Sequence, residues 1–358
     1  MILNLPEIKY EPVSRLFPSS YTALKGCHYK FILSKALGSK SILPISIHSY
    51  KGTFAHKILE HISRGNIFDE ESFSIFIERE LAVIDEQILR DGNHNYYPLR
   101  KNLKNFGLLK ISLRKFLKDR NDQKVPVNTG KFFSEMWCES KDKRVGGKID
   151  LIAEYPAYIE IADFKTGAIT EELMDDEGEK YEEIKVDYQE QLQLYGALFF
   201  EHTDKKPDAL FLIDLHKNKF EVNFSMDESL KLLSKAKQML DNINEEISSK
   251  EFVALPSVEN CKFCLNRPAC QHYQSALLNG LVTNDITVKI TKVQKFLNGN
   301  VSLFLETQKG NVIIKNFDTS FFDSFQKAIS KKVTVYNVRT DRMDNSFVSS
   351  NMTRIYEQ

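Results

Sequence analysis

GGKIDLIAEYPAYIEIADFK, residues 146–165, is the stretch around which we interpret the rest of the chain. Two runs rich in isoleucine flank Tyr155-Pro156-Ala157, and a proline between two such runs favours the turn of a β-hairpin. If the turn is centred between residues 156 and 157, Asp150 lies directly opposite Asp163. Facing residues on paired strands have Cβ atoms roughly 4.5–5.5 Å apart, so two negative charges at these positions repel each other.

A divalent cation would convert this repulsion into chelation, because carboxylates are the ligands that Mg²⁺ and Mn²⁺ favour. Lys165 follows Asp163 by two residues, and the alternation of a strand puts both side chains on the same face. An Asp-x-Lys sequence alone is common as an exposed ion pair. Together with a second acid at the mirror position, it makes a metal-dependent hydrolytic centre the leading hypothesis.

The composition indicates an ordinary soluble globular protein, with 358 residues, 42% of them hydrophobic and 27% charged. No apolar run approaches the ~20 residues that span a bilayer. The first residues, MILNLPEIKYEP, lack the layout of a signal peptide. We therefore expect a cytoplasmic protein that does not contact a membrane.

Charge is balanced overall but uneven along the chain. Residues 100–124 contain nine basic residues and two acidic ones, a surplus that could follow a phosphate backbone or simply form an exposed helix face. Residues 171–183 contain eight acidic residues and one lysine. Like charges close in sequence resist packing, so we expect this acidic run to form a loop.

Hydrophobic spacing predicts helices at about residues 21–33, 49–63, 70–90, 95–120, 186–200 and 227–248. Strands are predicted at residues 131–138, in the hairpin 146–165, and at 209–215 and 219–224. Helices that precede a mixed sheet with one crossover helix indicate an α/β core with an N-terminal helical subdomain.

After residue 284 the pattern changes to short β-rich runs, at residues 286–290, 301–305, 311–315 and 332–338, separated by turn signals. Such a region is typical of a small all-β barrel, and we expect one that resembles an OB-fold. The predicted domains are residues 1–278, with a helical insertion at about 49–125, and residues 284–358.

Three cysteines, Cys261, Cys264 and Cys270, follow the spacing C-x2-C-x5-C. Clustered cysteines in a cytosolic chain indicate metal or iron–sulfur ligation rather than disulfides. Cys27 is the candidate fourth ligand, whereas Cys138 lies in a predicted strand and is expected to be a buried small hydrophobe. Four thiolates suit Zn²⁺ and an iron–sulfur cluster equally well. The cluster would join distant parts of the chain, and its role would be structural.

In their order, these motifs resemble a known family. Asp150, Asp163-Phe164-Lys165 and Gln191-Leu192-Gln193-Leu194-Tyr195, bracketed by the cysteines, are similar to the PD-(D/E)XK nucleases of the RecB/AddB type. Within them, the chain resembles the branch with a cysteine-ligated [4Fe–4S] cluster, which includes CRISPR-adaptation exonucleases. The resemblance covers about residues 15–275. It implies a restriction-endonuclease-like mixed sheet and leaves the C-terminal β region outside.

The resemblance also implies roles for individual residues. Asp150 and Asp163 would hold one or two divalent metal ions, helped by the backbone carbonyl of Phe164 and by His56, which lies where that branch carries a histidine ligand. Lys165 would orient or deprotonate the attacking water and offset negative charge in the transition state. Gln191 and Tyr195, one helical turn apart, would face the site and contact substrate phosphate.

Two further positions complete this comparison. Glu135 stands where the family often carries an auxiliary acid, and Ile149 replaces the proline that precedes the first aspartate. The resemblance implies a [4Fe–4S] cluster on Cys27, Cys261, Cys264 and Cys270, while the spacing alone leaves Zn²⁺ open.

The predicted function is therefore a Mg²⁺- or Mn²⁺-dependent deoxyribonuclease, an exonuclease rather than an endonuclease, acting on single-stranded DNA or DNA ends. It would act in DNA repair, recombination or phage defence, beside a helicase or a defence-system partner protein. One alternative is a non-cleaving subunit that binds DNA ends and carries a structural iron–sulfur or zinc site. Another is a sequence-specific restriction nuclease, which cleavage of random-sequence DNA would distinguish.

Overall fold

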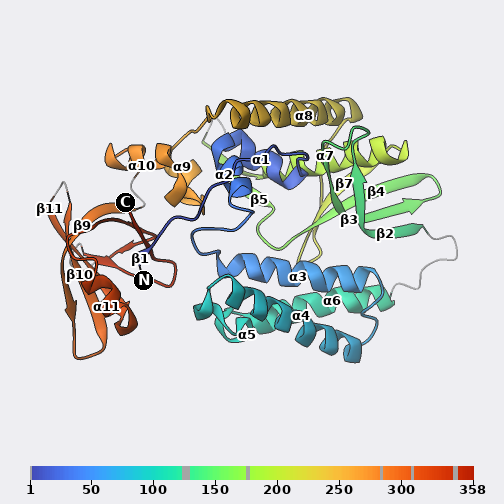
Figure 1. Ribbon diagram of the computed structural model, residues 1–358. Helices are drawn as coiled ribbons and strands as arrows, with labels where there is room; N and C mark the ends of the chain where they lie inside the picture. Colours follow the sequence, from blue (N-terminus) through green and yellow to red (C-terminus); the bar gives the residue numbers. More distant parts are fainter. Residues whose placement is uncertain (1, 123–129, 175–177, 283–284, 308–309, 342–345) are drawn as a thin grey trace. The chain divides into compact units, whose positions relative to one another are not determined.

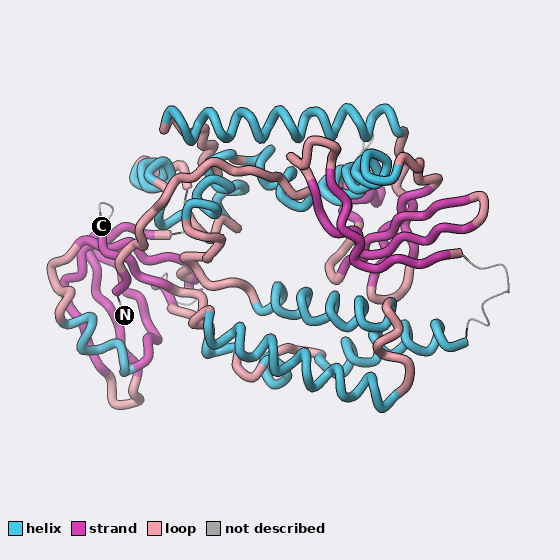
Figure 2. The backbone as a smooth tube through the Cα atoms, turned by 45° about the vertical axis from the view of Figure 1, so that its right-hand side comes forward, coloured by secondary structure: helices cyan, strands magenta, loops and turns pink. Residues whose placement is uncertain are grey.

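The computed structural model describes residues 2–122, 130–174, 178–282, 285–307, 310–341 and 346–358 (Figures 1 and 2). Its contacts divide the chain into two compact units, each assembled from segments distant in sequence. Unit 1 comprises residues 1–11, 26–45 and 249–358, and unit 2 comprises residues 12–25 and 46–248. No helix among the described residues combines the length and the apolar character needed to cross a membrane.

The helices are α1 (Pro18–Gly26), α2 (His28–Ala36), α3 (Ile47–Ser63), α4 (Glu70–Arg90), α5 (Leu99–Asn102), α6 (Phe106–Asp122), α7 (Val186–Thr203), α8 (Met226–Ser249), α9 (Val258–Lys262), α10 (Gln271–Leu278) and α11 (Phe322–Gln326), with 3-10 turns η1 (His94–Tyr96), η2 (Arg267–Ala269) and η3 (Thr319–Phe321). The strands are β1 (Ile2–Leu3), β2 (Lys131–Glu139), β3 (Gly146–Tyr155), β4 (Tyr158–Lys165), β5 (Thr170–Met174), β6 (Lys180–Ile184), β7 (Ala209–Asp214), β8 (Lys219–Glu221), β9 (Ile286–Lys295), β10 (Asn300–Thr307), β11 (Gly310–Asp318), β12 (Lys332–Tyr336), β13 (Arg339–Thr340), β14 (Phe347–Val348) and β15 (Arg354–Glu357). The prediction of a mixed α/β protein is confirmed.

Unit 2 is organised around a five-stranded mixed sheet with the strand order β2-β3-β4-β7-β8. The hairpin β3–β4 forms its centre, and β7 pairs parallel to β4 after the crossover helix α7. Figure 1 shows α7 and α8 on one side of this sheet and the helices α3 to α6 on the other. The apolar residues of α7 explain this position, because Leu192, Leu194, Leu198 and Phe199 are completely buried.

The helical part of unit 2 departs from the sequence pattern in one place. The helix expected at residues 95–120 is instead divided into η1, α5 and α6. Pro98 stands before α5 and lacks the backbone N–H that a continuous helix would use. Asn105, just before α6, has φ +62°, outside the helical region.

A second helix expected to be continuous, over residues 21–33, is also interrupted. Cys27 separates α1 from α2 with an extended backbone, φ −169° and ψ 110°. Gly26 ends α1, and a Cβ at this position would lie only 3.1 Å from Oδ1 of Asn260. The close approach of the Asn260 side chain favours glycine here, and the break places Cys27 between two helices rather than within one.

The acidic run at residues 171–183 was expected to be a loop, but strands β5 and β6 form an antiparallel ribbon there. Residues 175–177 lie outside the described residues. Lys180 forms an ion pair with Glu172 across the ribbon at 2.7 Å, which partly offsets the repulsion between the acids.

Unit 1 contains an eight-stranded sheet with the order β1-β15-β12-β9-β10-β11-β14-β13. Strands β9, β10 and β11 form a meander, α11 follows β11, and β12 returns to pair with β9. The chain then pairs β14 parallel to β11 and β15 antiparallel to β12. One buried core unites these strands, and it includes Leu303, Ile314, Phe325, Val333 and Ile355.

The cysteine-bearing segments pack in the same unit as this β-rich region. Arg267, in the C-x5-C segment, is 2% exposed and forms a two-pronged ion pair with Asp285, at 2.6 and 3.0 Å. A buried hydrophobic cluster that includes Cys261, Tyr273 and Tyr336 joins the cysteine-bearing segment to the β-rich region. Compact units therefore divide the chain differently from the boundary near residues 278–284 that the sequence pattern suggests.

Candidate active site

Three acidic residues stand in one row across three neighbouring strands. Strands β3 and β4 are paired from Tyr155↔Tyr158 to Leu151↔Ala162. The same register, continued by one residue, places Asp150 of β3 opposite Asp163 of β4. On the other side, Ser134↔Leu151 and Met136↔Ile149 place Glu135 of β2 opposite Asp150. Glu135 has φ +54°, a conformation that costs free energy for a residue with a side chain. The row thus combines close carboxylates with local backbone strain, a feature that clusters at functional sites.

The carboxyl group of Asp150 has a strongly shifted pKa. Burial raises its pKa well above the ordinary value, and the negative charge of Asp163 raises it further. The backbone N–H of Phe164 donates a 2.8 Å hydrogen bond to Oδ2 of Asp150, and this hydrogen bond acts to lower the pKa. Two carboxylates held this closely favour a cation between them.

Lys165 provides a positive charge at the end of β4. Its Nζ lies 2.8 Å from Oδ2 of Asp163 and donates a 2.9 Å hydrogen bond to Oε1 of Gln191. Asp163 is 4% exposed, and its Oδ2 lacks a donor with hydrogen-bond geometry among the described residues, so the contact with Lys165 is ionic only. The buried Oδ2 atom therefore retains the capacity to bind a further cationic or donor group.

His56 reaches the site from α3, with Nδ1 3.6 Å from Oδ2 of Asp150. Burial lowers the pKa of His56, although the charges of Asp163 and Glu135 act to raise it. A lowered pKa favours the neutral imidazole, which is the form that binds metal ions.

The crossover helix α7 supplies the remaining side chains. Tyr195 is 7% exposed, and burial raises the pKa of its hydroxyl, with Asp163 the next largest cause. The structure thus brings together every residue that the sequence suggested for this site: His56, Asp150, Asp163, Phe164, Lys165, Gln191 and Tyr195.

Sequence reasoning missed Tyr188 at this site. Its ring lies under the ammonium of Lys165, with Nζ 4.4 Å from the ring centroid. The signal was present, because Tyr188 precedes Gln191 by three residues on one helix and therefore shares its face. A cation over an aromatic face is attracted to it, so Tyr188 helps to place the lysine.

The donor types at this site fit Mg²⁺ or Mn²⁺. Oxygen atoms of Glu135, Asp150 and Asp163 and a neutral imidazole are available, and one buried carboxylate oxygen has no hydrogen-bond donor. Within the described ranges, no group of three or more histidine, cysteine or acidic side chains is arranged as a metal site. The residues are therefore chemically suitable for such an ion, but their side chains are not arranged as a metal site.

A second candidate site lies in unit 1, where Cys27, Cys261, Cys264 and Cys270 line one small cavity. Burial raises the pKa of three of these thiols, to about 12 for Cys270, and neighbouring cysteines contribute in the same direction. Lys30 and Arg267 also line the cavity, and their positive charges act to lower the pKa of Cys264. Four thiols beside two cations have the ligand chemistry of a negatively charged metal–thiolate group, although the described cysteines, too, are not arranged as a metal site. Cys138 is completely buried in unit 2 and takes no part.

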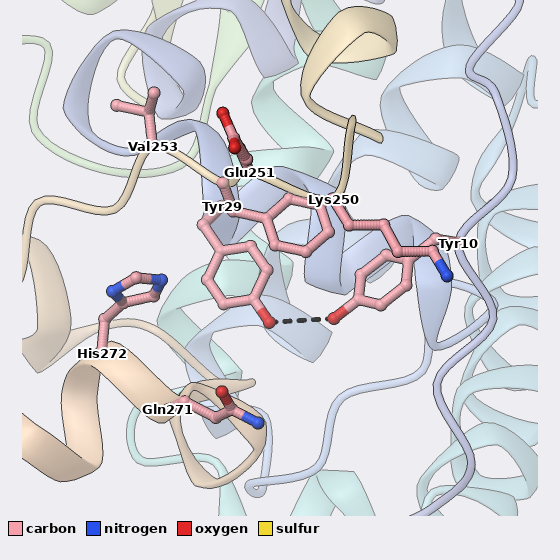
Figure 3. Close-up of a pocket in the computed structure, with 8 residues that line it drawn as sticks. Tyr10, Tyr29, Lys250, Glu251, Val253, Gln271 and His272 are labelled. Carbon is pink, nitrogen blue, oxygen red and sulfur yellow. Dashed lines mark hydrogen bonds between the residues drawn. The ribbon is translucent and has the colours of Figure 1, made fainter. Parts of the chain in front are cut away.

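A larger, open pocket of about 650 Å³ also lies in unit 1, and residues near Cys27 and Cys270 are among those that line it (Figure 3). The ring of Phe252 lies between the rings of Tyr10 and Tyr29, 4.7 Å from each. The two tyrosine hydroxyls are hydrogen-bonded at 2.9 Å, and His272 packs edge-on against Tyr29. This aromatic stack ties the chain next to Cys27 to the chain next to Cys270.

The hairpin sheet, the crossover helix and the row of acids with a lysine are the features to compare with known protein families. A comparison with protein families finds a match to the PD-(D/E)XK nuclease superfamily over residues 15–271. The chain therefore belongs to the PD-(D/E)XK nuclease superfamily. Membership supports nuclease activity and DNA as the substrate, and PD-(D/E)XK nucleases usually use divalent metals such as Mg²⁺ or Mn²⁺.

Comparisons with individual proteins are less specific. No curated protein sequence matches the chain. Among solved structures, a putative exonuclease from Eubacterium rectale shares 12% identity, with 73% of this chain and 88% of that chain covered and a TM-score of 0.41. A murine DNA binding protein bound with double-stranded DNA shares 9% identity, with 63% and 94% covered and a TM-score of 0.17.

Proposed function

We propose that the protein is a Mg²⁺- or Mn²⁺-dependent deoxyribonuclease that hydrolyses phosphodiester bonds in single-stranded DNA or at DNA ends. The observation that carries the proposal is the row of Glu135, Asp150 and Asp163 with the ammonium of Lys165 beside it. A row of acidic residues alone would destabilise the folded protein, because buried like charges repel each other. The ammonium of Lys165 beside Asp163, and the buried Oδ2 of Asp163 that accepts no hydrogen bond from a described residue, support hydrolysis as the better account.

Asp150 and Asp163, with the backbone carbonyl of Phe164 and His56, would hold the metal ion. When bound, a divalent ion polarises the phosphate and makes water a stronger nucleophile at neutral pH.

Side chains of the protein perform the remaining tasks. Gln191 accepts the hydrogen bond from Lys165 and fixes the direction of its ammonium group. From there Lys165 orients the attacking water, whose oxygen forms a bond to phosphorus while the bond to the leaving oxygen breaks. The ammonium also offsets the negative charge that grows on the phosphate oxygens. Tyr195, buried beside Gln191, contributes a hydroxyl that remains protonated and can donate to a phosphate oxygen.

We further propose exonuclease rather than endonuclease action, within the RecB/AddB type and its iron–sulfur branch. Cys27, Cys261, Cys264 and Cys270 would hold a structural [4Fe–4S] cluster, with Zn²⁺ as the alternative. Their gathering around one cavity lined by Lys30 and Arg267 supports this proposal. The cell would use such an enzyme in DNA repair, recombination or phage defence, beside a helicase or a defence partner.

The β-rich part of unit 1 is proposed to be an OB-fold barrel. The support is its strand order: a three-stranded meander, a helix after the third strand, and a last segment that pairs with both β11 and β12.

The central test is Asp163→Ala in the full chain. We expect Asp163→Ala to bind DNA but to lose cleavage in Mg²⁺ or Mn²⁺, measured on end-labelled random-sequence single-stranded and duplex DNA. Asp227→Ala, which removes an exposed acid at the start of α8, is the matched control and should cleave normally. Undiminished cleavage by Asp163→Ala would reject the assignment.

The cysteine proposal has its own test. Anaerobically purified protein should be brown, with the broad blue-light absorption of an iron–sulfur protein, and should contain iron and acid-labile sulfide. Cys261→Ala should lose this absorption, whereas Cys138→Ala should keep it. Zinc without iron would identify the alternative metal.

A further inference from the structure

Helix α6 carries most of the basic residues in the range 100–124. This helix packs against strand β4, which carries Asp163 and Lys165. The ring of Phe116 on α6 packs edge-on against the ring of Phe164, with 6.0 Å between centroids. Phe164 is the residue between Asp163 and Lys165, and its N–H donates to Asp150. The basic helix is therefore anchored directly to the strand that carries the candidate catalytic residues.

A second basic element meets α6 at the same end of the sheet. Strand β7 pairs parallel to β4, so that Asp214 stands beside Lys165, and the turn that follows β7 begins there. The side chain of Asp214 accepts hydrogen bonds from the backbone N–H groups of His216 and Asn218, which fixes the shape of this turn. The turn presents Lys217, whose backbone has φ +70°.

Lys217 and Lys115 are held next to each other. Nζ of Lys217 donates a 2.6 Å hydrogen bond to the backbone carbonyl of Lys115 and lies 5.4 Å from the ring centroid of Phe116. Burial, followed by the positive charge of Lys115, lowers the pKa of Lys217. Lys115 and Lys118, one helical turn apart, are both exposed. Lys115 therefore adds its positive charge beside Lys217, and clustered positive charge attracts a polyanion.

We infer that Lys115 and Lys217 form a binding site for a backbone phosphate of the DNA strand, at the end of the sheet that carries the scissile-bond residues. Lys118 extends this site along α6. The inference rests on the proposed function for the identity of the polyanion, because DNA is the polyanion that a deoxyribonuclease binds. Contacts of this kind fix the register of the strand without reading its sequence.

The test measures binding separately from cleavage. In the full chain with Asp163→Ala, the affinity for a fluorescent single-stranded oligonucleotide is measured between low and moderate salt, with and without Lys115→Gln/Lys217→Gln. We expect the lysine substitutions to weaken binding by about tenfold and to reduce the slope of log K against log salt by about 1 to 2. Lys231→Gln/Lys235→Gln, which removes two exposed lysines from α8, should leave affinity and slope unchanged.

Position is tested with oligonucleotides in which one phosphate at a time is replaced by a neutral methylphosphonate. Replacement of one particular phosphate should weaken binding to the protein that keeps both lysines. The same replacement should not lower the affinity any further when Lys115 and Lys217 are glutamine. Lys115→Arg/Lys217→Arg should restore both the affinity and this position-dependent effect, which a purely structural role would not predict.

The outcomes separate the two proposals. If the wild-type protein cleaves DNA and the glutamine variant keeps its affinity and salt slope, the phosphate site is overturned and the nuclease stands. If the wild-type protein cleaves nothing but the lysine-dependent methylphosphonate effect is present, the site is supported and the proposed hydrolysis is overturned.

Discussion

The carboxylate of Asp150 accepts a 2.8 Å hydrogen bond from the backbone N–H of Phe164, the residue that separates Asp163 from Lys165. One aspartate is thereby oriented by the backbone of the strand that carries the other. The side-chain alternation of β4 then directs Asp163 and Lys165 to one face and Phe164 to the opposite face, where Phe116 packs against it. A single residue thus connects the acidic row with the basic helix α6.

The raised pKa of Asp150 predicts how the stability of the metal-free protein depends on pH. In the unfolded chain Asp150 ionises near pH 4, whereas in the folded chain it keeps its proton to higher pH. Its contribution to stability is therefore fully present below about pH 4 and is lost as the pH rises toward the folded-state pKa. We expect the unfolding midpoint in EDTA to fall over this range and Asp150→Asn to flatten the fall.

Metal ions should reverse this trend. Because a divalent ion binds the ionised carboxylate, Mg²⁺ or Mn²⁺ should raise the unfolding midpoint more at pH 8 than at pH 5. Thermal unfolding followed by dye fluorescence, with and without an excess of the metal ion, measures both effects. Asp227→Asn should behave like the wild-type protein. An equal metal response at both pH values would contradict the role given to Asp150.

The hydrogen bond between Lys165 and Gln191 predicts coupled effects on catalysis. Lys165→Ala should lower kcat by about 10²–10⁴, because it removes a group that acts in the transition state. Gln191→Ala should lower kcat by about tenfold, since the ammonium loses its orienting acceptor. The double variant should be no slower than Lys165→Ala, because Gln191 acts through the lysine.

Gln193 provides the control for this cycle. It lies on the same helix, but its side chain donates to the backbone carbonyl of Asn223 instead. Gln193→Ala should leave single-turnover rates unchanged. Fully additive losses in the double variant would show that Gln191 acts independently of Lys165.

The local part of this architecture could be predicted, because it depends on patterns a few residues apart. Proline between two isoleucine-rich runs was enough to predict the register that sets Asp150 opposite Asp163, and the structure has that register. The break at Cys27 could not be predicted in the same way. The apolar spacing continues across it, and the residue that packs against Gly26, just before the break, is Asn260, more than two hundred residues away.

The division into units shows the same limit. Ile2 pairs with Ile355, and Arg267 is buried against Asp285, so the two ends of the chain and the cysteine segment fold together. Periodicity carries no information about such distant partners. Tyr188, by contrast, could have been assigned to the site, because its spacing from Gln191 and its place on an amphipathic helix were visible.

The buried ion pair in unit 1 predicts a large effect on stability. Arg267 donates to both oxygens of Asp285 and to the backbone carbonyl of Cys264, and Tyr273 donates to the same aspartate. Arg267→Met would leave the charge of Asp285, which is 2% exposed, without its cationic partner. We expect a loss of about 3–5 kcal/mol in the free energy of unfolding of unit 1.

Hydrogen exchange at strands β9 and β12 during urea unfolding would measure this loss. Arg267→Met/Asp285→Asn should recover part of the stability, because the second substitution removes the unpaired charge. Arg339→Met, which changes an exposed arginine of β13, should have little effect. If Arg267→Met were equally mild, the ion pair would not hold the cysteine segment on the β-rich region.

Gly147 predicts a coupling between packing and activity in unit 2. A Cβ at this position would lie 3.1 Å from Cδ of Pro18 and 3.1 Å from Cε1 of Tyr195, so at least one ring must move. Tyr195 is buried on α7 and has little room to move. Gly147→Ala should therefore cost about 1–3 kcal/mol of stability and should lower kcat as the tyrosine shifts relative to Gln191.

Gly107→Ala is the opposite case, because no atom lies within 4 Å of its Cβ position on α6, and alanine there should raise stability by up to about 1 kcal/mol. A Gly147→Ala protein with normal stability and normal kcat would show that the contact between β3 and Tyr195 does not position the hydroxyl.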